Sequence, residues 1–452
     1  MSAEALLLAA LRRAPRRYAL PALPASVEEA AAEGPASALA FSIEHAREAL
    51  ARGATPAAEL GHAFTAALDA LIRSALQPGT GDAAFQAAVL QVRAPEVGTH
   101  ARLAARHERD RRAARAAVDA LAHPGKLRAL PSGTWRDGLA GLHALAARDD
   151  WPAVTRALDA LHADATAVDA TALERVRAHP AIARLVRAAE LATTPAVRHY
   201  ESLRGDGGPR AGSAGAASTG KQAKRRGAAT EARTLAALAA VATRLDAADP
   251  VGPRHRAVGG LLVPKGYPGD PVRAKNEWDA ALVREAATAD HGELCLLVEA
   301  KASPEAAHAD LPRLWRGLRR LAEARAGSVY RFPTRDGMVA LDGDSLRRLQ
   351  PPASALPPTV FYCCDAPADH PQRLDAASRG MLLSEPACLA FAARLLDGAL
   401  ASSDELTPVW RDLLQARRLV AVLHQHANAR TVREAMLHPD DLLAASDAEG
   451  AG

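Results

Sequence analysis

Aromatic side chains are scarce in this chain of 452 residues, since Phe, Tyr and Trp together make up only 4% of it. So few large rings are typical of helices that pack through small side chains. The length is too great for one ordinary hydrophobic core, and we therefore expect two or three domains.

Cysteine is also sparse. The four cysteines, Cys295, Cys363, Cys364 and Cys388, show no C-x-x-C spacing, which argues against a zinc ribbon or a dithiol redox motif. Cys295 and Cys363 lie in apolar, strand-like runs and are expected to be buried thiols. Unpaired thiols are typical of a reducing compartment, so we expect a cytoplasmic protein.

Long apolar runs and a strong net charge are missing as well. No run approaches the ~18 residues that a membrane-spanning helix needs, so no membrane partner is expected. The formal net charge of +4 is small for this length and does not by itself indicate nucleic acid. The Arg-rich N-terminus has features of a transit peptide, but it contains Glu4 and only a short apolar run, and we expect an ordinary first helix.

Helical periodicity dominates the first 200 residues. Apolar residues recur three and four positions apart, as in Leu60, Phe64 and Leu68. The pattern predicts an all-α N-terminal domain over residues 1–203, to which the sequence assigns no role. We expect helices over Ala3–Arg13, Ser37–Arg52, Pro56–Leu76, Asp82–Val92, His100–Ala122, Thr134–Ala147, Trp151–Leu161 and Ala170–Ala192.

Arginines gather on one flank of the helix expected near residue 107. They form either an exposed face balanced by Glu108 and Asp110 or a face that contacts phosphates, and the sequence leaves both open.

Residues 204–220 are rich in Gly, Ser and Ala and predict a disordered linker between domains. The next domain spans residues 221–400, and residues 401–452 form C-terminal helices and a tail. The elements expected after the linker are a helix (Gly227–Asp246), three strands (Arg256–Val263, Glu277–Val283, Glu293–Lys301), a helix (Pro304–Arg325), a hairpin (Ser328–Leu341), a strand (Thr359–Cys364), and three more helices (Glu385–Gly398, Leu406–His426, Ala429–Leu443).

Two of these strands bring charged side chains together. The third strand is an apolar run that ends in Glu299, Ala300 and Lys301, and strand alternation places Glu299 and Lys301 on one side. Asp279 interrupts the apolar second strand, and antiparallel pairing would set it beside Glu299. Because unpaired buried carboxylates cost several kcal/mol, a metal ion would be a good reason to keep them there.

Asp279, followed about twenty residues later by Glu299-Ala300-Lys301, resembles the D…(D/E)-x-K signature of the PD-(D/E)XK nuclease superfamily. The expected element order, α-β-β-β-α-β, is similar to the restriction-endonuclease-like core of that superfamily. Glu231, on the first helix, matches a glutamate that the family often carries there. One departure is that no Pro precedes Asp279. The resemblance implies an α/β fold for residues 221–400, beside the all-α N-terminal domain.

The resemblance also implies a function, a metal-dependent nuclease that hydrolyses phosphodiester bonds in nucleic acid, with DNA as the expected substrate. Asp279, Glu299 and the Ala300 carbonyl would hold Mg²⁺ or Mn²⁺, because hard cations prefer oxygen ligands and no Cys/His cluster accompanies the site. Lys301 would orient or help deprotonate the attacking water, with a pKa lowered by the metal and by burial. Glu231 would hold a metal-bound water or a second ion.

Three basic residues, Lys224, Arg225 and Arg226, come at the expected start of the Glu231 helix. They would contact phosphates, because the positive end of a helix also favours anions.

Other interpretations remain open. Glu299 and Lys301 could form an ordinary ion pair at a strand end, and Glu231 could be a solvated helix position. The chain would then be a nuclease-fold protein that binds nucleic acid or acts as a scaffold without cleaving, or a helical interaction protein whose E-x-K is coincidental. Cleavage of both strands of a duplex usually needs two sites, which a dimer would supply, but no residue pattern indicates one.

Overall fold

The computed structural model describes residues 3–163, 165–206, 214–286, 290–352, 355–369 and 371–447. The chain forms two compact units. The sheet unit combines Met1–Ala67, Arg210–Arg379 and Trp410–Gly452, and the helical unit combines Leu68–Pro209 and Gly380–Val409. The expected mixture of a helical region and an α/β region is therefore present. Among the helices described, none has the length and apolar composition needed to cross a membrane.

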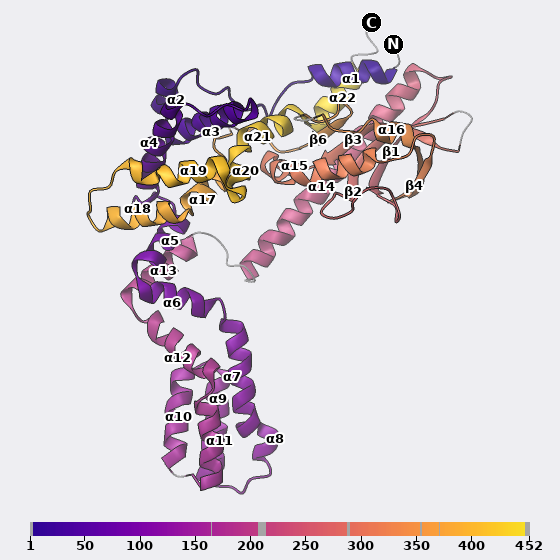
Figure 1. Cartoon of the computed structure of the whole chain (residues 1–452). Helices are drawn as coiled ribbons and strands as arrows, with labels where there is room; N and C mark the ends of the chain where they lie inside the picture. The colour runs from indigo at the N-terminus through magenta and orange to yellow at the C-terminus, as the bar shows by residue number, and fades with distance from the viewer. Residues whose placement is uncertain are drawn as a thin grey trace. The chain divides into compact units, whose positions relative to one another are not determined.

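The helical unit is built from short amphipathic helices. One core of this unit gathers Leu142, Trp151, Val154 and Leu185, and another gathers smaller side chains around Tyr200. The helices of this unit are α5 (Ala83–Arg93), α6 (Pro95–Ala104), α7 (His107–Ala122), α8 (Pro124–Leu127), α9 (Thr134–Ala147), α10 (Trp151–Ala163), α11 (Ala167–Arg177), α12 (Pro180–Ala192), α13 (Pro195–Asp206) and α18 (Pro386–Leu396), with a short turn η1 (Ser403–Leu406) (Figure 1).

Two helices expected to be continuous are interrupted in this unit. The segment His100–Ala122 is shared between α6 and α7, and Ala170–Ala192 between α11 and α12. The second break falls at Pro180, which is the first residue of α12, and the His179 side chain accepts a hydrogen bond from Ala181 N. A proline fits the first helical position because that N–H would have no partner in the helix.

The arginine-rich flank of α7 is balanced by carboxylates. Arg111 pairs with Glu108 at 2.8 Å, and Arg115 with Asp149 at 2.9 Å. These pairs favour the exposed, charge-balanced face of the two interpretations left open by the sequence, but Asp110 is buried and pairs instead with Arg184 of α12 at 2.7 Å.

In the described part of the chain, seven strands form one sheet in the order β1-β2-β3-β5-β4, with β6 pairing β3 and β7 pairing β6. The neighbours β1, β2 and β3 run antiparallel, and β6 runs parallel to β3. The hairpin β4–β5 was predicted and is confirmed. The strands are β1 (His255–Leu262), β2 (Glu277–Glu285), β3 (Gly292–Ala300), β4 (Val329–Thr334), β5 (Gly337–Asp342), β6 (Val360–Cys363) and β7 (Met436–Leu437).

Helices cover both faces of the sheet. On one face, α15 (Pro304–Ala322) packs Leu311, Leu314 and Leu318 against apolar strand residues. On the other face lie α1 (Ala3–Arg13), α14 (Ala214–Ala248) and α22 (Pro439–Asp447), and Figure 1 shows α14 as the long helix beside the sheet. This two-sided burial explains the nearly continuous apolar runs of β2 and β3.

The first 67 residues belong to the sheet unit, whereas residues 1–203 were expected to form one helical domain. Leu7 and Leu11 of α1 are buried in the core that α14 and α22 share with the sheet. The Tyr18 hydroxyl lies 2.7 Å from the carbonyl oxygens of both Cys364 and Ala366, which share its single proton. These long-range contacts have no signal in the local helical pattern. The helices α2 (Val27–Glu33), α3 (Pro35–Ala51) and α4 (Ala58–Ala75) follow α1.

The boundary between the two units falls at Pro209/Arg210, inside the segment 204–220 that was predicted as the linker, but the expected disorder is wrong where the structure describes this segment. Residues 204–206 end α13 and residues 214–220 begin α14, while 207–213 lie outside the described residues. Ala is the best helix former, and it is frequent in the second half of this segment, which offsets the glycines.

The C-terminal region was predicted as two helices and contains several shorter elements. From Thr407 the chain continues through α19, η2, α20 and α21, then adds β7 to the sheet before α22. The remaining elements are α16 (Gly343–Arg347), α17 (Ala376–Leu383), α19 (Thr407–Gln415), η2 (Arg417–Leu419), α20 (Val420–Leu423) and α21 (Gln425–Glu434), and the division between the two units falls within α17 and α19.

Candidate active site

Asp279 and Glu299 lie side by side at the ends of β2 and β3. Ala280 pairs with Val298 in the antiparallel ladder, so the next position outward sets Asp279 opposite Glu299. The Asp279 Oδ2 atom accepts a hydrogen bond of 2.9 Å from the backbone N–H of Ala300. The predicted pairing of these two strands is therefore confirmed, and it brings the two carboxyl groups of the sequence motif together.

Glu299 is the most deeply buried charged group of the site, with only 1% of its side chain exposed. Its Oε1 atom accepts hydrogen bonds from Lys275 Nζ at 2.6 Å and Lys301 Nζ at 2.5 Å. Burial, and then the neighbouring Asp279, raise the pKa of Glu299 to about 7 against the opposing effect of the two lysines. Two ammonium groups thus only partly offset the loss of water around this carboxylate.

Lys301 follows β3 directly and joins two carboxylates. It donates to Glu299 and lies 3.3 Å from Asp310 Oδ2, on α15. Burial would lower the pKa of Lys301, but the attraction of Glu299 and Asp310 outweighs it, and the net pKa is raised. The expectation of a lowered pKa is wrong for the protein without a metal ion, because the sequence did not show that two carboxylates surround the ammonium group.

Lys275 is a member of the site that the sequence analysis missed. It lies in the loop before β2, its side chain is 6% exposed, and its ammonium group sits 5.7 Å from the centre of the Trp278 ring. A lysine is almost never buried to this degree without a partner. In the sequence, only its position two residues before the strand that carries Asp279 pointed to a role of Lys275 at this site.

Glu231 is held by an arginine that the sequence also did not indicate. Arg335, in the β4–β5 turn, donates a short hydrogen bond to Glu231 Oε1. The pKa of Arg335 is raised mainly by its hydrogen bond to Glu231, and more weakly by the charges of Glu277 and Asp279. Glu231 comes from α14, which covers the sheet face opposite α15, so Arg335 links it to the site across the strand ends.

The backbone of β1 makes room for this arginine. Gly260 has a positive φ of 63°, and a Cβ atom there would lie 2.9 Å from Arg335 Cγ. The Arg335 N–H also donates to Gly259 O at 3.0 Å. A residue with a side chain at position 260 would have a strained backbone and would clash with Arg335.

Lys224, Arg225 and Arg226 are exposed on α14. They do not lie at the helix start, because α14 begins at Ala214, ten residues earlier. The helix dipole acts only within the first turn, so the expectation that the positive helix end stabilises a phosphate bound by these residues is wrong. Because they are exposed, they can bind a polyanion by electrostatic attraction without the helix dipole.

Several buried polar atoms of the site have no hydrogen-bond partner among the described residues. They include Glu299 Oε2 and the Tyr362 hydroxyl, on the strand position that pairs with Glu299. Burial, with Asp310 and Glu299 nearby, raises the pKa of Tyr362. Buried polar atoms normally find a partner, so a water molecule or a cation at Glu299 Oε2 would satisfy an atom that the described residues leave unpaired.

This donor set fits a hard divalent cation only with the help of water. The part of the chain that the structure describes contains no group of three or more His, Cys, Asp or Glu side chains arranged to hold a metal. Asp279 and Glu299 are two carboxylates, and Mg²⁺ commonly binds one or two carboxylates while keeping several waters.

No protein-family model, curated protein sequence or solved structure matches this chain. The function proposed below therefore depends on the residues and geometry already described.

Proposed function

We propose that this chain is a metal-dependent nuclease that hydrolyses phosphodiester bonds in nucleic acid, with DNA as the substrate. The observation that carries the proposal is the juxtaposition of Asp279 and Glu299, with Lys301 on Glu299 Oε1 and Glu299 Oε2 left without a hydrogen-bond partner among the described residues. The order α14, β1, β2, β3, α15, β6 supports a restriction-endonuclease-like core in which β4, β5 and α16 are an insertion.

Asp279, Glu299 Oε2 and the Ala300 carbonyl are the groups that would hold Mg²⁺ or Mn²⁺. Such an ion, when bound, supplies positive charge for the phosphate and lowers the pKa of a water molecule. Lys301 would offset phosphate charge and orient the attacking water from the Glu299 side. Arg335 would keep Glu231 neutralised near the strand ends, and Lys224, Arg225 and Arg226 would contact the nucleic-acid backbone.

A second candidate is a nuclease-fold protein that binds nucleic acid or acts as a scaffold without cleaving it. The observation in its favour is that cations of the chain already neutralise the acidic groups. Lys275 and Lys301 share Glu299, and Arg335 pairs with Glu231.

Nicking of supercoiled plasmid in Mg²⁺ or Mn²⁺ tests the first candidate, with single-stranded DNA and RNA in parallel. The informative variants are Asp279→Asn and Lys301→Ala. Their matched controls are Asp270→Asn and Lys265→Ala, which change exposed residues of the loop before β2. Metal-dependent cleavage that is lost only in the first pair supports the nuclease.

Calorimetric titration of Mg²⁺ and Mn²⁺ completes this test. Absence of cleavage of every substrate, together with absence of metal binding, would reject the nuclease and leave the non-cleaving protein. In that case, Lys224, Arg225 and Arg226, replaced together by Ala, should weaken nucleic-acid binding and reduce its salt dependence.

A further inference from the structure

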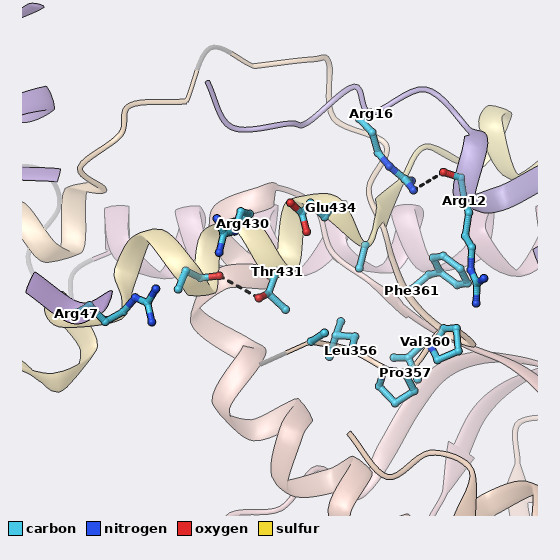
Figure 2. Close-up of a pocket in the computed structure, with 14 residues that line it drawn as sticks. Arg12, Arg16, Arg47, Leu356, Pro357, Val360, Phe361, Arg430, Thr431 and Glu434 are labelled. Carbon is cyan, nitrogen blue, oxygen red and sulfur yellow. Dashed lines mark hydrogen bonds between the residues drawn. The ribbon is translucent and has the colours of Figure 1, made fainter. Parts of the chain in front are cut away.

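A basic cavity of about 350 Å³ opens in the sheet unit, away from the paired carboxylates. We call it the arginine pocket. It lies between the end of α1, α3, the loop before β6, and α21, and its four arginines are Arg12, Arg16, Arg47 and Arg430 (Figure 2). Its size is in the range of pockets that hold small organic ligands.

The charges of the arginine pocket are unbalanced. Four arginines line it, and Glu434 is its one acidic lining residue among those described. Arg47 is neutralised by Glu44, with two contacts of 2.8 Å. Arg16 donates to the carbonyl oxygen of Arg12 at 2.7 Å, which gives a carbonyl at the end of α1 a partner. The positive charge of Arg16 is not neutralised by this contact.

Arg12 and Arg430 are the two arginines best placed to bind an anion. Both are exposed at the pocket, and neither forms an ion pair within the described residues. Guanidinium groups bind phosphate oxygens in a fixed, often bidentate geometry. In Figure 2 the Arg12 guanidinium lies beside Phe361 and the Arg430 guanidinium lies beyond Glu434, so a phosphate ester held by Arg12 would gain from Arg16 and Arg430 only as added positive charge.

The remainder of the pocket indicates more than a bare phosphate ion. Leu356, Pro357, Val360 and Phe361 supply apolar walls beside the arginines (Figure 2). Glu434 would repel an inorganic anion, but its carboxylate can accept hydrogen bonds from sugar hydroxyls or from the N–H groups of a base. A ligand with a phosphate, hydroxyl groups and an apolar ring matches all three features.

We propose that the arginine pocket binds a nucleoside monophosphate group, with Arg12 on the phosphate, Arg16 and Arg430 adding positive charge, and Glu434 on the sugar or base. This group comes either from a free nucleotide or from the phosphorylated end of a nucleic-acid strand. Val360 starts β6 two positions before Tyr362, which pairs with Glu299, so the pocket begins ~7 Å along the strand from the carboxylates. The proposal does not depend on nuclease activity.

Calorimetry with four probes tests this pocket: adenosine 5′-monophosphate, adenosine, a 5′-phosphorylated oligothymidylate, and the same strand with a 5′-hydroxyl. The pocket variant is Arg12→Ala/Arg430→Ala, and the control is Arg319→Ala, an exposed arginine of α15 outside the pocket. Because all three arginines are exposed, thermal denaturation should show unchanged folding. Loss of charge-assisted hydrogen bonds should weaken phosphate-dependent binding at least about tenfold in the pocket variant only.

The probes also identify the source of the phosphate. Binding of the free nucleotide indicates a small-molecule ligand, and binding of the phosphorylated strand alone indicates a strand end. Asp279→Asn should lose cleavage and still bind the nucleotide, so failure of the pocket and failure of the nuclease can be told apart. The proposal is overturned if no phosphorylated probe binds, if adenosine binds as well as its monophosphate, or if the pocket variant binds like the control.

Glu434 gives the proposal a second, independent measurement. Glu434→Gln removes the one negative charge among the described lining residues and keeps the shape of the side chain. We expect it to strengthen the binding of inorganic phosphate and to weaken the preference for adenosine 5′-monophosphate over inorganic phosphate, each at least about threefold. Equal changes for both probes would show that Glu434 acts only through its charge, and would overturn its assignment to the sugar or base.

Discussion

The ammonium group of Lys275 lies 2.6 Å from Glu299 Oε1, and both side chains are almost fully buried. Lys301 contacts the same oxygen atom at 2.5 Å. One side of the carboxylate is therefore occupied by two lysines, and the other, Oε2, has no hydrogen-bond partner within the described residues. Oε2 is therefore the oxygen to which a cation would bind without replacing a lysine contact.

Replacing Lys275 by Met should destabilise the fold strongly. Glu299 would keep one ammonium partner in a buried site, and breaking a buried ion pair typically costs about 3–5 kcal/mol. We expect the free energy of unfolding, measured by urea denaturation, to fall by about 3 kcal/mol at pH 7.5. The fall should be smaller at pH 5, where Glu299 is protonated. Lys265→Met, on the same loop but exposed, should change the free energy of unfolding by less than about 0.5 kcal/mol.

The double variant Lys275→Met/Glu299→Gln separates the ion pair from simple packing. If the pair is responsible, adding Glu299→Gln should recover most of the lost stability. The assignment would be contradicted if Lys275→Met caused the same loss in the wild-type protein and in the Glu299→Gln variant.

Stability should fall as pH rises through neutrality because of Glu299. Its pKa in the folded protein is about 7, compared with about 4.3 for an ordinary glutamate. Between these values the folded protein retains a proton that the unfolded chain has released, so a rise in pH favours unfolding. From pH 4.5 to 7.5, wild type should lose roughly 3 kcal/mol relative to Glu299→Gln, measured in a chelator. Parallel pH curves for the two proteins would refute this.

The pairing of Asp279 with Glu299 could be predicted from the sequence because it depends on local rules. Side chains alternate along a strand, and a polar turn between two apolar runs favours antiparallel neighbours. The partners Lys275 and Arg335 could not be predicted in this way. Lys275 comes from an irregular loop, and Arg335 comes from a hairpin 104 positions after Glu231, so only the folded chain brings them to the carboxylates.

In the helical regions, too, the sequence predicts features that depend on local patterns and misses those that depend on long-range contacts. The ranges Ala3–Arg13 and Thr134–Ala147 were predicted as observed, since each is a periodic segment with clear ends. The break before Pro180 had a signal, because a residue that precedes proline avoids helical geometry. The packing of α1 on the sheet unit depends on contacts with α14 and α22, which a periodic pattern cannot specify.

Glu231 should matter less for cleavage than Asp279. Its carboxylate is bound to Arg335, whose side chain is 47% exposed, so Glu231 acts on the site mainly through that arginine. We expect Glu231→Gln to lower the rate of plasmid nicking less than about tenfold, and Asp279→Asn at least about 100-fold. Because exposed ion pairs contribute at most about 1 kcal/mol, Arg335→Ala should leave stability nearly unchanged. If Glu231→Gln lowered the nicking rate as much as Asp279→Asn, Glu231 would instead act directly on the reacting groups.

Gly317 fixes the distance between α15 and the Lys275 loop. A Cβ atom at this position would lie 2.7 Å from Lys275 Cβ and 3.0 Å from Trp278 Cζ2. Alanine normally stabilises a helix interior relative to glycine by about 1 kcal/mol, but overpacking of a core costs about 1–3 kcal/mol. We expect Gly317→Ala to lower the free energy of unfolding and to weaken metal binding, because the loop must move away from Glu299. Gly227→Ala is the matched control, since a Cβ there meets nothing within 4 Å on α14, and it should be stabilising. If both variants stabilise the protein equally, the loop yields without cost, and Lys275 is not held in place by α15.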